Sequence, residues 1–445
     1  MKVPRAMRFP RARRRSLRRG AVYVFVLASA MVVAMVSMAV LAVAQINGRV
    51  VAQANDSAEA EVLAEAATEF ALSAIASDAN WRTDYPTSMP VGPLALGRGT
   101  ISFSIADDAG GNLVSNPADP VRISGTGIVR GAKKVYSLRC ASGGALSCLQ
   151  VSAAFGGKIS LTSMTLTGGS AVSLTSNALI TPISATSVSF GMATTLQAPT
   201  TITTLLCSGT TPTTTSGTRS LPDPVHVFDY YKANGTQITI GSIPASGTLH
   251  TMQLALLSPG SNPYGGGTNA QGIYWIDCKS TEALQISNCR IVGTLVIFNP
   301  AATSGTINSN YFAPAVSNYP ALLVQGNWSL GTVATNLADS AATGNATTPT
   351  INYNPANTPY NGVSDTTYTT TYPSRIDGIV YASGNLTGKN APAVNGVLLA
   401  GGTFTQSSGS LTLTYNSAYY TNPPPGFTSS TIVPVPGSWK WEKAP

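Results

Sequence analysis

Hydrophobic and polar positions divide this chain into a basic opening, a long apolar run and an alternating remainder. No charge occurs from Ala21 to Ala44, and the first one beyond is Arg49. As a helix rising about 1.5 Å per residue, this run spans about 36 Å, enough to cross a hydrocarbon core of about 30 Å. The apolar core of a secretory signal is shorter, about 7–15 residues, although "AVAQ" near Ala44 resembles a weak cleavage site. The pattern predicts a membrane-spanning helix, with a cleaved signal as the alternative.

The helix is predicted to continue past the apolar run. Residues 45–77 contain no proline and a single glycine, and they are rich in the helix formers Ala, Glu and Leu. The turn-prone segment "SDANW" at 77–81 is the expected end. The helical period separates an acidic stripe from a small apolar face. The stripe is Glu61, Glu65 and Glu69, and the apolar face is Leu63, Ala66, Ala67, Phe70 and Ala74. The stripe either faces solvent or meets basic groups on neighbouring subunits.

From residue 81 onward, short alternations of apolar and polar positions predict β-strands. Segment 81–150 is predicted to be a small β-rich domain, a hairpin or meander with a turn at "DDAGGN" (107–112). Segment 151–220 is predicted to be a Ser/Thr-rich β segment, with strands to about 206 and a linker to 220. Asp107, Asp108 and Asn112 have side chains that suit calcium, but a turn uses the same residues and the EF-hand spacing is absent.

Residues 221–416 contain short apolar strands separated by Gly and Asn corners. Examples are "RIDGIVYASGNLTG" (375–388) and "VNGVLLAGGTFTQ" (394–406). This pattern predicts a right-handed parallel β-helix or related solenoid, and its irregular spacing leaves a β-sandwich as the alternative. Residues 417–445 are predicted to be a Pro-rich C-terminal tail. The expected fold class is therefore mainly β with one long N-terminal helix.

Charge is concentrated at the start of the chain. Nine basic residues lie in 1–19, against a net charge of +8 for the whole chain, so the remainder carries −1. This distribution argues against a nucleic-acid-binding surface. Arginines beside an apolar helix are expected to stay on the cytoplasmic side, which places the bulk of the chain outside.

The sequence offers little catalytic chemistry. Polysaccharide-active β-helices need clustered carboxylates, whereas the acids of the predicted β-helix are sparse and not brought together by spacing. They are Asp277, Glu282, Asp339, Asp365 and Asp377. The two histidines, His226 and His250, make a histidine metal site unfavourable. We therefore predict no catalytic residue, no metal and no cofactor.

The densest polar and aromatic cluster is "LPDPVHVFDYYKANGTQI" at 221–238. It combines Asp223, His226, Asp229, Tyr230 and Tyr231, which suggests a histidine–carboxylate pair. The structural interpretation is a turn at "PDP", a strand at "VHVFDYY" and a hairpin turn at "ANGT", and we favour it.

The chain contains five cysteines. Cys140 and Cys148 are close enough in sequence for a disulfide, as are Cys278 and Cys289, which would leave Cys207 over. The alternative is that all five are small core hydrophobes.

The opening of the chain resembles type IV prepilins and pseudopilins. A basic leader ends at Gly20, a long apolar helix begins at Ala21, and an Ala-rich extension follows. The likeness is to minor proteins of the PilX type or the general-secretion K type. It implies cleavage after Gly20 by a prepilin peptidase and methylation of Ala21. Phe25 stands where major pilins carry glutamate. Near the end, "GIVYASGNLTG", "GVLLAGG" and "YNSAYYTNPPPGF" resemble a β domain of uncharacterised function on PilX-like proteins.

Two functions follow from these patterns. The first is a structural minor pilin or pseudopilin of a type IV pilus or type II secretion assembly, with other pilin subunits as partners. It would be anchored in the bacterial inner membrane, with its bulk periplasmic or extracellular. The second is a membrane-anchored β-helix that binds or cleaves surface polysaccharide.

Overall fold

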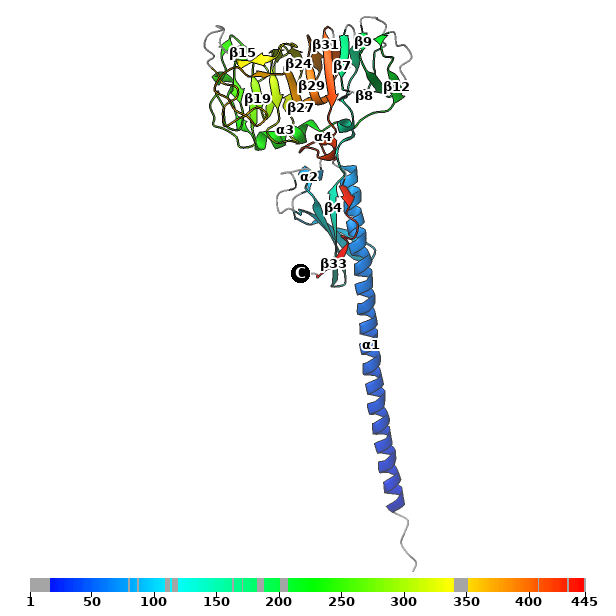
Figure 1. The fold of residues 1–445 in the computed structure, drawn as a ribbon. Coiled ribbons are helices and arrows are strands. Elements are labelled where there is room, and N and C mark those ends of the chain that lie inside the picture. The colour runs from blue at the N-terminus through cyan, green and yellow to red at the C-terminus, as the bar shows by residue number, and fades with distance from the viewer. Residues whose placement is uncertain are drawn as a thin grey trace, which may run out of the picture.

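The computed structural model describes residues 17–78, 81–85, 88–108, 113, 119–161, 164–169, 171–181, 188–200, 207–339, 351–406, 408–429 and 432–443. A long helix carries a small β-sheet against its C-terminal half, and a larger stack of short strands lies beyond the end of the helix (Figure 1). The expected class, mainly β with one long N-terminal helix, is confirmed.

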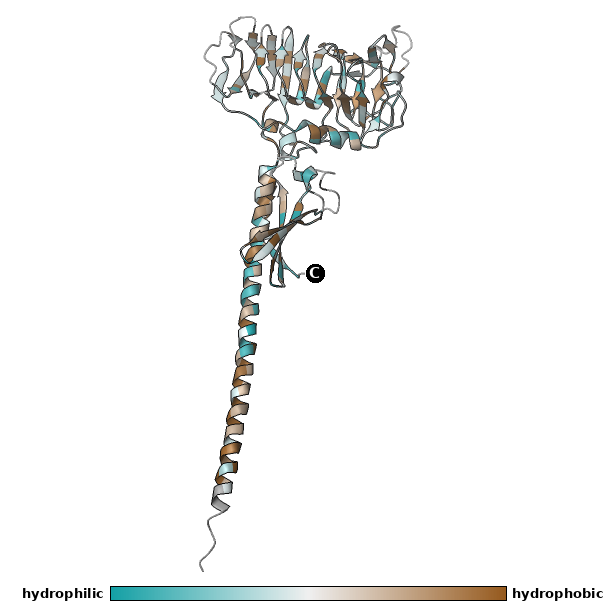
Figure 2. Cartoon of the chain, turned by 180° about the vertical axis from the view of Figure 1, so that it is seen from behind, coloured by the Kyte–Doolittle hydropathy of each residue, from teal (hydrophilic) through white to brown (hydrophobic). Residues whose placement is uncertain are grey.

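The long helix α1 runs over Leu17–Ser77 and has 61 residues. It ends at the predicted "SDANW" turn, and the short helix α2 (Trp81–Asp84) follows. The first half of α1 is apolar and touches no other element, so large side chains from Val22 to Val51 are exposed. Its most apolar window has a mean hydropathy of 2.6, which is sufficient for a membrane span (Figure 2).

The small domain is one antiparallel sheet. Strands β1 to β4 form a meander, and two C-terminal strands pair with the outer edge of β4. The strands are β1 (Val91–Leu96), β2 (Gly99–Asp107), β3 (Val121–Val129), β4 (Ala132–Ser142), β32 (Ile432–Pro434) and β33 (Lys440–Glu442). The predicted meander is confirmed.

The prediction of a Pro-rich tail over 417–445 is wrong. This segment contains the short helix α4 (Ala418–Thr421) and then β32 and β33, which lie along β4. Ile432 and Trp439 are partly buried against the core of the small domain, and this packing fixes the segment despite its prolines. Everything between β4 and β32 is consequently an insertion into the small domain.

Helix α1 packs on this sheet through small residues. Ala60, Ala64 and Ala67 are fully buried, as is Thr68. Opposite them, a Cβ on Gly125 would lie 2.4 Å from the Ala64 carbonyl oxygen. The helix and the sheet therefore approach as closely as backbones allow. Of the predicted apolar face, Leu63 and Ala67 are buried, whereas Phe70 is 46% exposed with its ring 6.0 Å from that of Phe103.

The inserted residues form what we call the parallel-strand unit, built on two sheets. In the eight-stranded sheet every neighbouring pair is parallel except β14 with β15. Its strands are β14 (Ala245–Ser246), β15 (Leu249–Gln253), β18 (Ala283–Ser287), β21 (Gly305–Asn308), β24 (Trp328–Thr332), β28 (Leu386–Gly388), β30 (Phe404–Gln406) and β6 (Ile159–Leu161).

The second sheet has 17 strands, all paired in parallel. They are β5 (Ala153–Phe155), β7 (Met164–Gly168), β8 (Ala171–Ser176), β9 (Val188–Phe190), β10 (Ala193–Ala198), β11 (Ser208–Gly209), β12 (Thr213–Ser216), β13 (Thr236–Gln237), β16 (Leu256–Leu257), β17 (Ile273–Asp277), β19 (Arg290–Val292), β20 (Thr294–Phe298), β22 (Tyr311–Ala313), β23 (Leu322–Gln325), β27 (Arg375–Ala382), β29 (Ala393–Ala400) and β31 (Ser410–Tyr415). The antiparallel β-sandwich alternative does not fit this pairing.

The chain enters this unit in the middle rather than at one end. Strands β5 to β12 extend outward in one direction, and β13 to β31 begin at the far end and return. The two parts join where β29, β30 and β31 pair with β5, β6 and β7. Short strands at 208–209 and 213–216 lie within the predicted linker, and 201–206 falls outside the described residues.

Helix α3 (Pro224–Ala233) connects the two ends, so the predicted strand at "VHVFDYY" is wrong. Asp223 caps the helix by accepting from the Val225 backbone N–H at 2.9 Å, and Pro224 suits the first turn. Val227, Phe228 and Tyr231 are buried against the 17-stranded sheet. The predicted hairpin at "ANGT" is also wrong, because the following strand β13 pairs in parallel with β17.

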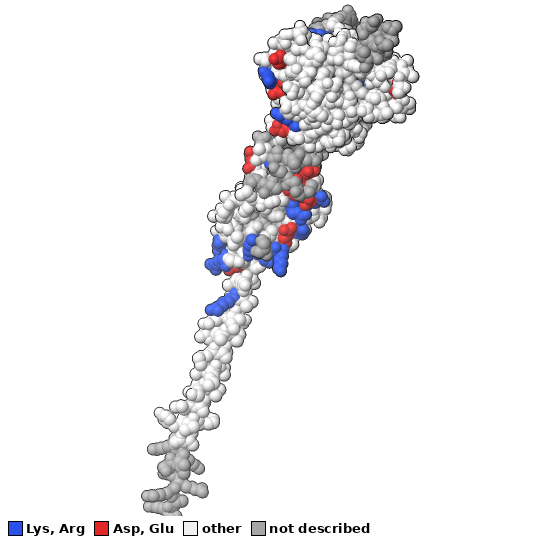
Figure 3. Space-filling model, turned by 90° about the vertical axis from the view of Figure 1, so that its left-hand side faces the viewer, with Lys and Arg blue, Asp and Glu red and all other residues white. Residues whose placement is uncertain are grey.

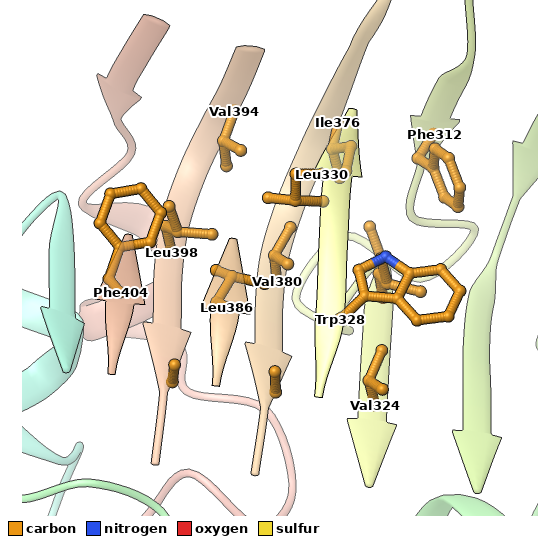
Figure 4. Packing of buried hydrophobic residues seen from close by; sticks show 14 of the residues in the cluster. Phe312, Val324, Trp328, Leu330, Ile376, Val380, Leu386, Val394, Leu398 and Phe404 are labelled. Atoms are coloured by element: carbon orange, nitrogen blue, oxygen red, sulfur yellow. The ribbon is translucent and has the colours of Figure 1, made fainter. Parts of the chain in front are cut away.

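Apolar side chains stack inside the unit from one turn of the chain to the next. Residues 375–382 and 393–400 pair in register, with Gly378 opposite Gly396 and Val380 opposite Leu398. Figure 4 shows Val380, Leu398 and Phe404 within this core. The Phe404 ring stacks on that of Phe155 at 4.7 Å, across the junction of the two parts. One strand pair and two short helices complete the unit. The antiparallel pair is β25 (Leu337–Ala338) with β26 (Thr371–Tyr372), and the 3-10 helices are η1 (Ser147–Gln150) and η2 (Ile240–Ser242).

Candidate functional site: the exposed helix and its groove

Gly20 lies in the first turn of α1, where the fold does not require a glycine. A Cβ placed on Gly20 would meet nothing within 4 Å. Glycine inside a helix is less favourable than alanine by about 0.8–1.0 kcal/mol. The next residue, Ala21, is exposed on the helix. Packing in this structure therefore gives no reason for a glycine at position 20.

Phe25 lies on the same exposed stretch, with 77% of its surface accessible. Between Gly20 and Arg49, Tyr23 is the only residue whose side chain can ionise. The surface around Phe25 is therefore apolar. Such a surface is stable in lipid or against other apolar helices rather than in water.

The packed half of α1 begins with ion pairs to the small domain. Arg98 contacts both Asp56, at 3.8 Å, and Glu59. Lys134 contacts Glu61 at 2.7 Å. The first member of the predicted acidic stripe is thus neutralised within the chain.

The other two members of the stripe, Glu65 and Glu69, line an open groove between α1 and the β4–β33 edge. The groove has a volume of about 620 Å³, and its lining is Val62, Glu65, Ala66, Glu69, Tyr136 and Trp439. Both glutamates are exposed and form no ion pair within the described part of the chain.

Aromatic rings form the opposite wall of this groove. The wall consists of Tyr136 on β4 and Trp439, whose ring centroids are 5.5 Å apart, and the Trp441 ring packs on Tyr136 at 4.5 Å without lining the groove. Carboxylates beside aromatic faces attract a cationic side chain. Local sequence patterns do not predict this wall, because Trp439 comes from a segment that was expected to be a tail.

All five cysteines are free thiols in the structure, so the two predicted disulfides are not present. Cys140 is buried in the small domain, whereas Cys148 lies in the separate core against α3, which keeps this pair apart. Cys278 and Cys289 are buried inside the parallel-strand unit. Burial raises the pKa of each of these four thiols to about 12. Cys207 is half-buried against the same interior.

The other sequence candidates are held by structural contacts. Asp108 pairs with Arg122 at 2.7 Å and Arg139 at 2.6 Å, so arginines take the place considered for calcium. Asn112 lies outside the described residues. Within the described ranges no three His, Cys, Asp or Glu side chains cluster as metal ligands do.

The polar and aromatic residues of the cluster at 221–238 lie on and beside α3, where they have different neighbours. His226 Nδ1 is 3.7 Å from Asp223 Oδ2, but that carboxylate also caps the helix. The Tyr230 hydroxyl lies 3.1 Å from that of Tyr319, and Tyr231 is fully buried. This arrangement orders the helix.

One contact between ionisable groups and one pair of carboxylates that share a hydrogen-bond donor residue appear only in the fold. The pairing of β15 with β18 brings His250 Nε2 to 3.1 Å from Glu282 Oε2. Asp339 and Asp365 both accept from Thr370, through its backbone N–H and its hydroxyl respectively. Burial raises the pKa of Asp339. Its carboxylate is occupied by the backbone N–H groups of Tyr353 and Thr370, which is a structural arrangement.

Comparison with known proteins gives weak structural likenesses. The chain is similar to a competence-associated pilin, ComZ, from Thermus thermophilus, with a TM-score of 0.30 and 9% identity over 87% of this chain and 97% of that one. It is also similar to an ice binding protein from an Antarctic biological consortium, with a TM-score of 0.23 and 12% identity over 60% and 89%. Both TM-scores are too low to establish a shared fold. No family model and no curated protein matches the sequence.

Proposed function

We propose that this protein is a membrane-anchored accessory subunit of a type IV pilus or a type II secretion pseudopilus. The observation that carries the proposal is the division of α1. One half exposes a continuous apolar surface and the other is packed on a small antiparallel sheet. A subunit of this form can wait in a membrane and later place the same apolar helix against those of its neighbours.

The basic leader and Gly20 support proteolytic cleavage between the leader and the apolar helix. A prepilin peptidase would cut after Gly20, and Ala21 would become the methylated N-terminus. The exposure of Gly20 and Ala21 suits access by an enzyme, and packing supplies no other role for this glycine. Before that cut, the arginines of the leader hold the start of the helix in the cytoplasm, with the bulk of the chain beyond the bacterial inner membrane.

Phe25 supports an accessory rather than a repeating role. In an apolar helical core a glutamate can neutralise the terminal amine of the next subunit, and an unpaired charge there is costly. Phenylalanine supplies no such partner. We propose a terminal or low-copy position, with the groove at Glu65 and Glu69 receiving a basic side chain of a neighbouring pilin-like subunit.

The parallel-strand unit would then be the exported head of the subunit. We propose that it is a right-handed parallel β-helix with a structural or binding role and no catalysis. Asp339, Glu282 and Asp377 are engaged with backbone groups, a histidine and an arginine respectively rather than arranged as an acid and a base.

The test is the N-terminus of the protein in membranes. Mass spectrometry is expected to find a chain that begins at methylated Ala21. Gly20→Leu should block processing and leave a chain that begins with the basic leader, with slower electrophoretic mobility. Ala21→Ser, which keeps the glycine, serves as the control and should still be cut. An intact leader in the wild type would contradict the proposal.

A further inference from the structure

Part of the eight-stranded sheet presents a regular outer row of hydroxyl groups. On the adjacent strands β24, β28, β30 and β6, Ser329 lies opposite Thr387, Thr387 opposite Thr405, and Thr405 opposite Ser160. All four residues are partly exposed. Neighbouring strands are about 4.8 Å apart. The row is therefore a rigid ladder of hydroxyls with a fixed repeat.

A second column, of amides, lies at the corner before these strands. Asn327 Oδ1 accepts from the Asn385 backbone N–H at 2.8 Å, and Asn385 Oδ1 accepts from the Thr403 backbone N–H at 2.8 Å. A Cβ on Gly384 would lie 2.5 Å from Asn327 Oδ1, so glycine is needed beside the amide. With each oxygen committed, each exposed NH2 group remains a donor, and neither has an acceptor among the described residues.

These groups border a shallow groove of about 240 Å³. Its lining is Ala302, Asn327, Trp328, Ser329, Asn385, Thr387 and Lys389. Lys389 follows β28 and Lys158 precedes β6, two strands away. The two lysines therefore flank the hydroxyl row at opposite ends of these parallel strands, about 10 Å apart along the stack. Both are exposed and form no ion pair in the described chain.

No carboxylate lies on this part of the sheet. Segments 157–161, 326–332, 383–391 and 401–406, which contain the four strands and their corners, include no Asp or Glu. Elsewhere charge gathers on the small domain, and the parallel-strand unit is nearly uncharged over most of the face in Figure 3. The two lysines and the amide and hydroxyl donors therefore form a patch that favours an anionic partner rich in acceptors.

We propose that this patch binds an acidic polysaccharide whose repeating sugars carry carboxylates. An extended sugar chain would place hydroxyls and ring oxygens along the row of Ser and Thr hydroxyls, and carboxylates against Lys158 and Lys389. A phosphate-dense polymer is a poorer fit, because only two cations face a long row of uncharged donors. This inference goes beyond the proposed function, since it concerns what the exported unit holds and not how the subunit is anchored.

The experiment measures binding of the full-length protein in detergent to polygalacturonate and to alginate, with dextran as the neutral comparison. Binding to at least one acidic polymer is expected, with affinity falling as salt is raised and dextran binding at least tenfold weaker. Lys158→Gln with Lys389→Gln should reduce acidic-polymer affinity about tenfold or more. Lys279→Gln, at an exposed corner after β17, is the matched control and should leave it unchanged.

Asn385→Asp provides a second variant. It keeps the oxygen that accepts from Thr403 but replaces the NH2 donor by an anionic oxygen, so binding should fall while the thermal midpoint stays near that of the wild type. Absence of binding to both acidic polymers would overturn the proposal. Equal affinity for dextran, or full affinity in the double lysine variant, would also overturn it.

Discussion

Two buried arginines anchor irregular segments by binding backbone carbonyls. Arg290 is 2% exposed and donates to the carbonyls of Tyr353, Thr358 and Pro359. Its guanidinium also lies 5.2 Å from the centre of the Tyr372 ring. Arg82, 6% exposed, donates to the Leu113 and Asp119 carbonyls. Burial lowers the pKa of Arg82 to about 10, so it stays charged at neutral pH. Each cation thus holds a loop through hydrogen bonds that a hydrophobic residue could not make.

The Asp108 carboxylate makes the small domain sensitive to acid. Its hydrogen bond from Arg122 holds the pKa of Asp108 below the ordinary value of 3.8. The unfolded chain therefore binds this proton more readily than the folded one. The stabilisation by this ion pair is complete above pH 3.8, and it is lost as the pH falls through the lower pKa that Asp108 has in the folded protein.

We therefore expect Asp108→Asn to unfold at a lower denaturant concentration than the wild type at neutral pH, with the difference shrinking under strong acid. Denaturant titrations of the variant and the wild type at about pH 7 and again at about pH 2, with the protection of residues 121–142 compared between the two proteins at each pH, measure this. Asp84→Asn, at an exposed position, is the control. A gap that stays constant over this range would show that the ion pair is not the cause.

At the scale of elements, the contact between α1 and the sheet depends on the absence of side chains. Gly125 and Gly127 face Ala60, Ala64 and Thr68 across a gap that holds no Cβ. The contacting residues on the helix and on the sheet are small, so most of the contact is between the two backbones. A helix held in this way is rigid, and it fixes the exposed apolar half relative to the small domain.

Gly125→Ala should destabilise the small domain by about 1–3 kcal/mol, the usual cost of overpacking a close contact. The new Cβ would lie 2.4 Å from Thr68 Oγ1 as well as from the Ala64 carbonyl oxygen. Urea unfolding followed by hydrogen exchange in β2 to β4 gives the change. Gly241→Ala, where a Cβ meets nothing within 4 Å, should be close to neutral. Equal effects of the two substitutions would exclude a steric origin.

Sequence patterns gave the individual elements better than their connections. The uninterrupted helix formers of 45–77 predicted α1 and its end at the 77–81 turn, and the alternation within 81–150 predicted a hairpin or meander where β2 to β4 lie. The segment "VHVFDYY" failed because aromatic and β-branched residues favour strands, whereas the cap at Asp223 and tertiary burial of Phe228 selected a helix. The sequence predicted only the acidic wall of the groove at Glu65. The aromatic wall combines Tyr136 and Trp439, which lie about 300 residues apart and meet through a strand pairing that local patterns do not encode.

On the scale of the whole molecule, the C-terminal segment connects the parallel-strand unit back to the small domain. The parallel-strand unit leaves the small domain after β4 and returns to it through β32 and β33. Ser137 Oγ donates to Glu442 at 2.7 Å, and Trp441 packs on Tyr136. The last strands therefore stabilise the small domain and complete the aromatic wall of the groove.

A chain that ends at residue 429 should keep the parallel-strand unit folded and loosen the small domain. Its loss of β32 and β33 removes backbone pairing to β4 and the Tyr136 contacts. Hydrogen exchange is expected to rise over 121–142 and to stay unchanged over 273–298. Equal exchange of both regions in wild type and truncated chain would mean that the C-terminal strands contribute no stability.

Because the chain enters the parallel-strand unit in the middle of the stack, the order in which its strands are synthesised determines when each strand edge becomes paired. If the chain is exported from its N-terminus, as we propose, β5 to β7 emerge early and present an open strand edge until β29 to β31 arrive more than 200 residues later. The small sheet waits even longer, for β32 and β33. Because unpaired edges invite aggregation, an exported chain of this topology would need protection until its final residues have crossed the membrane, and only then would its fold be complete.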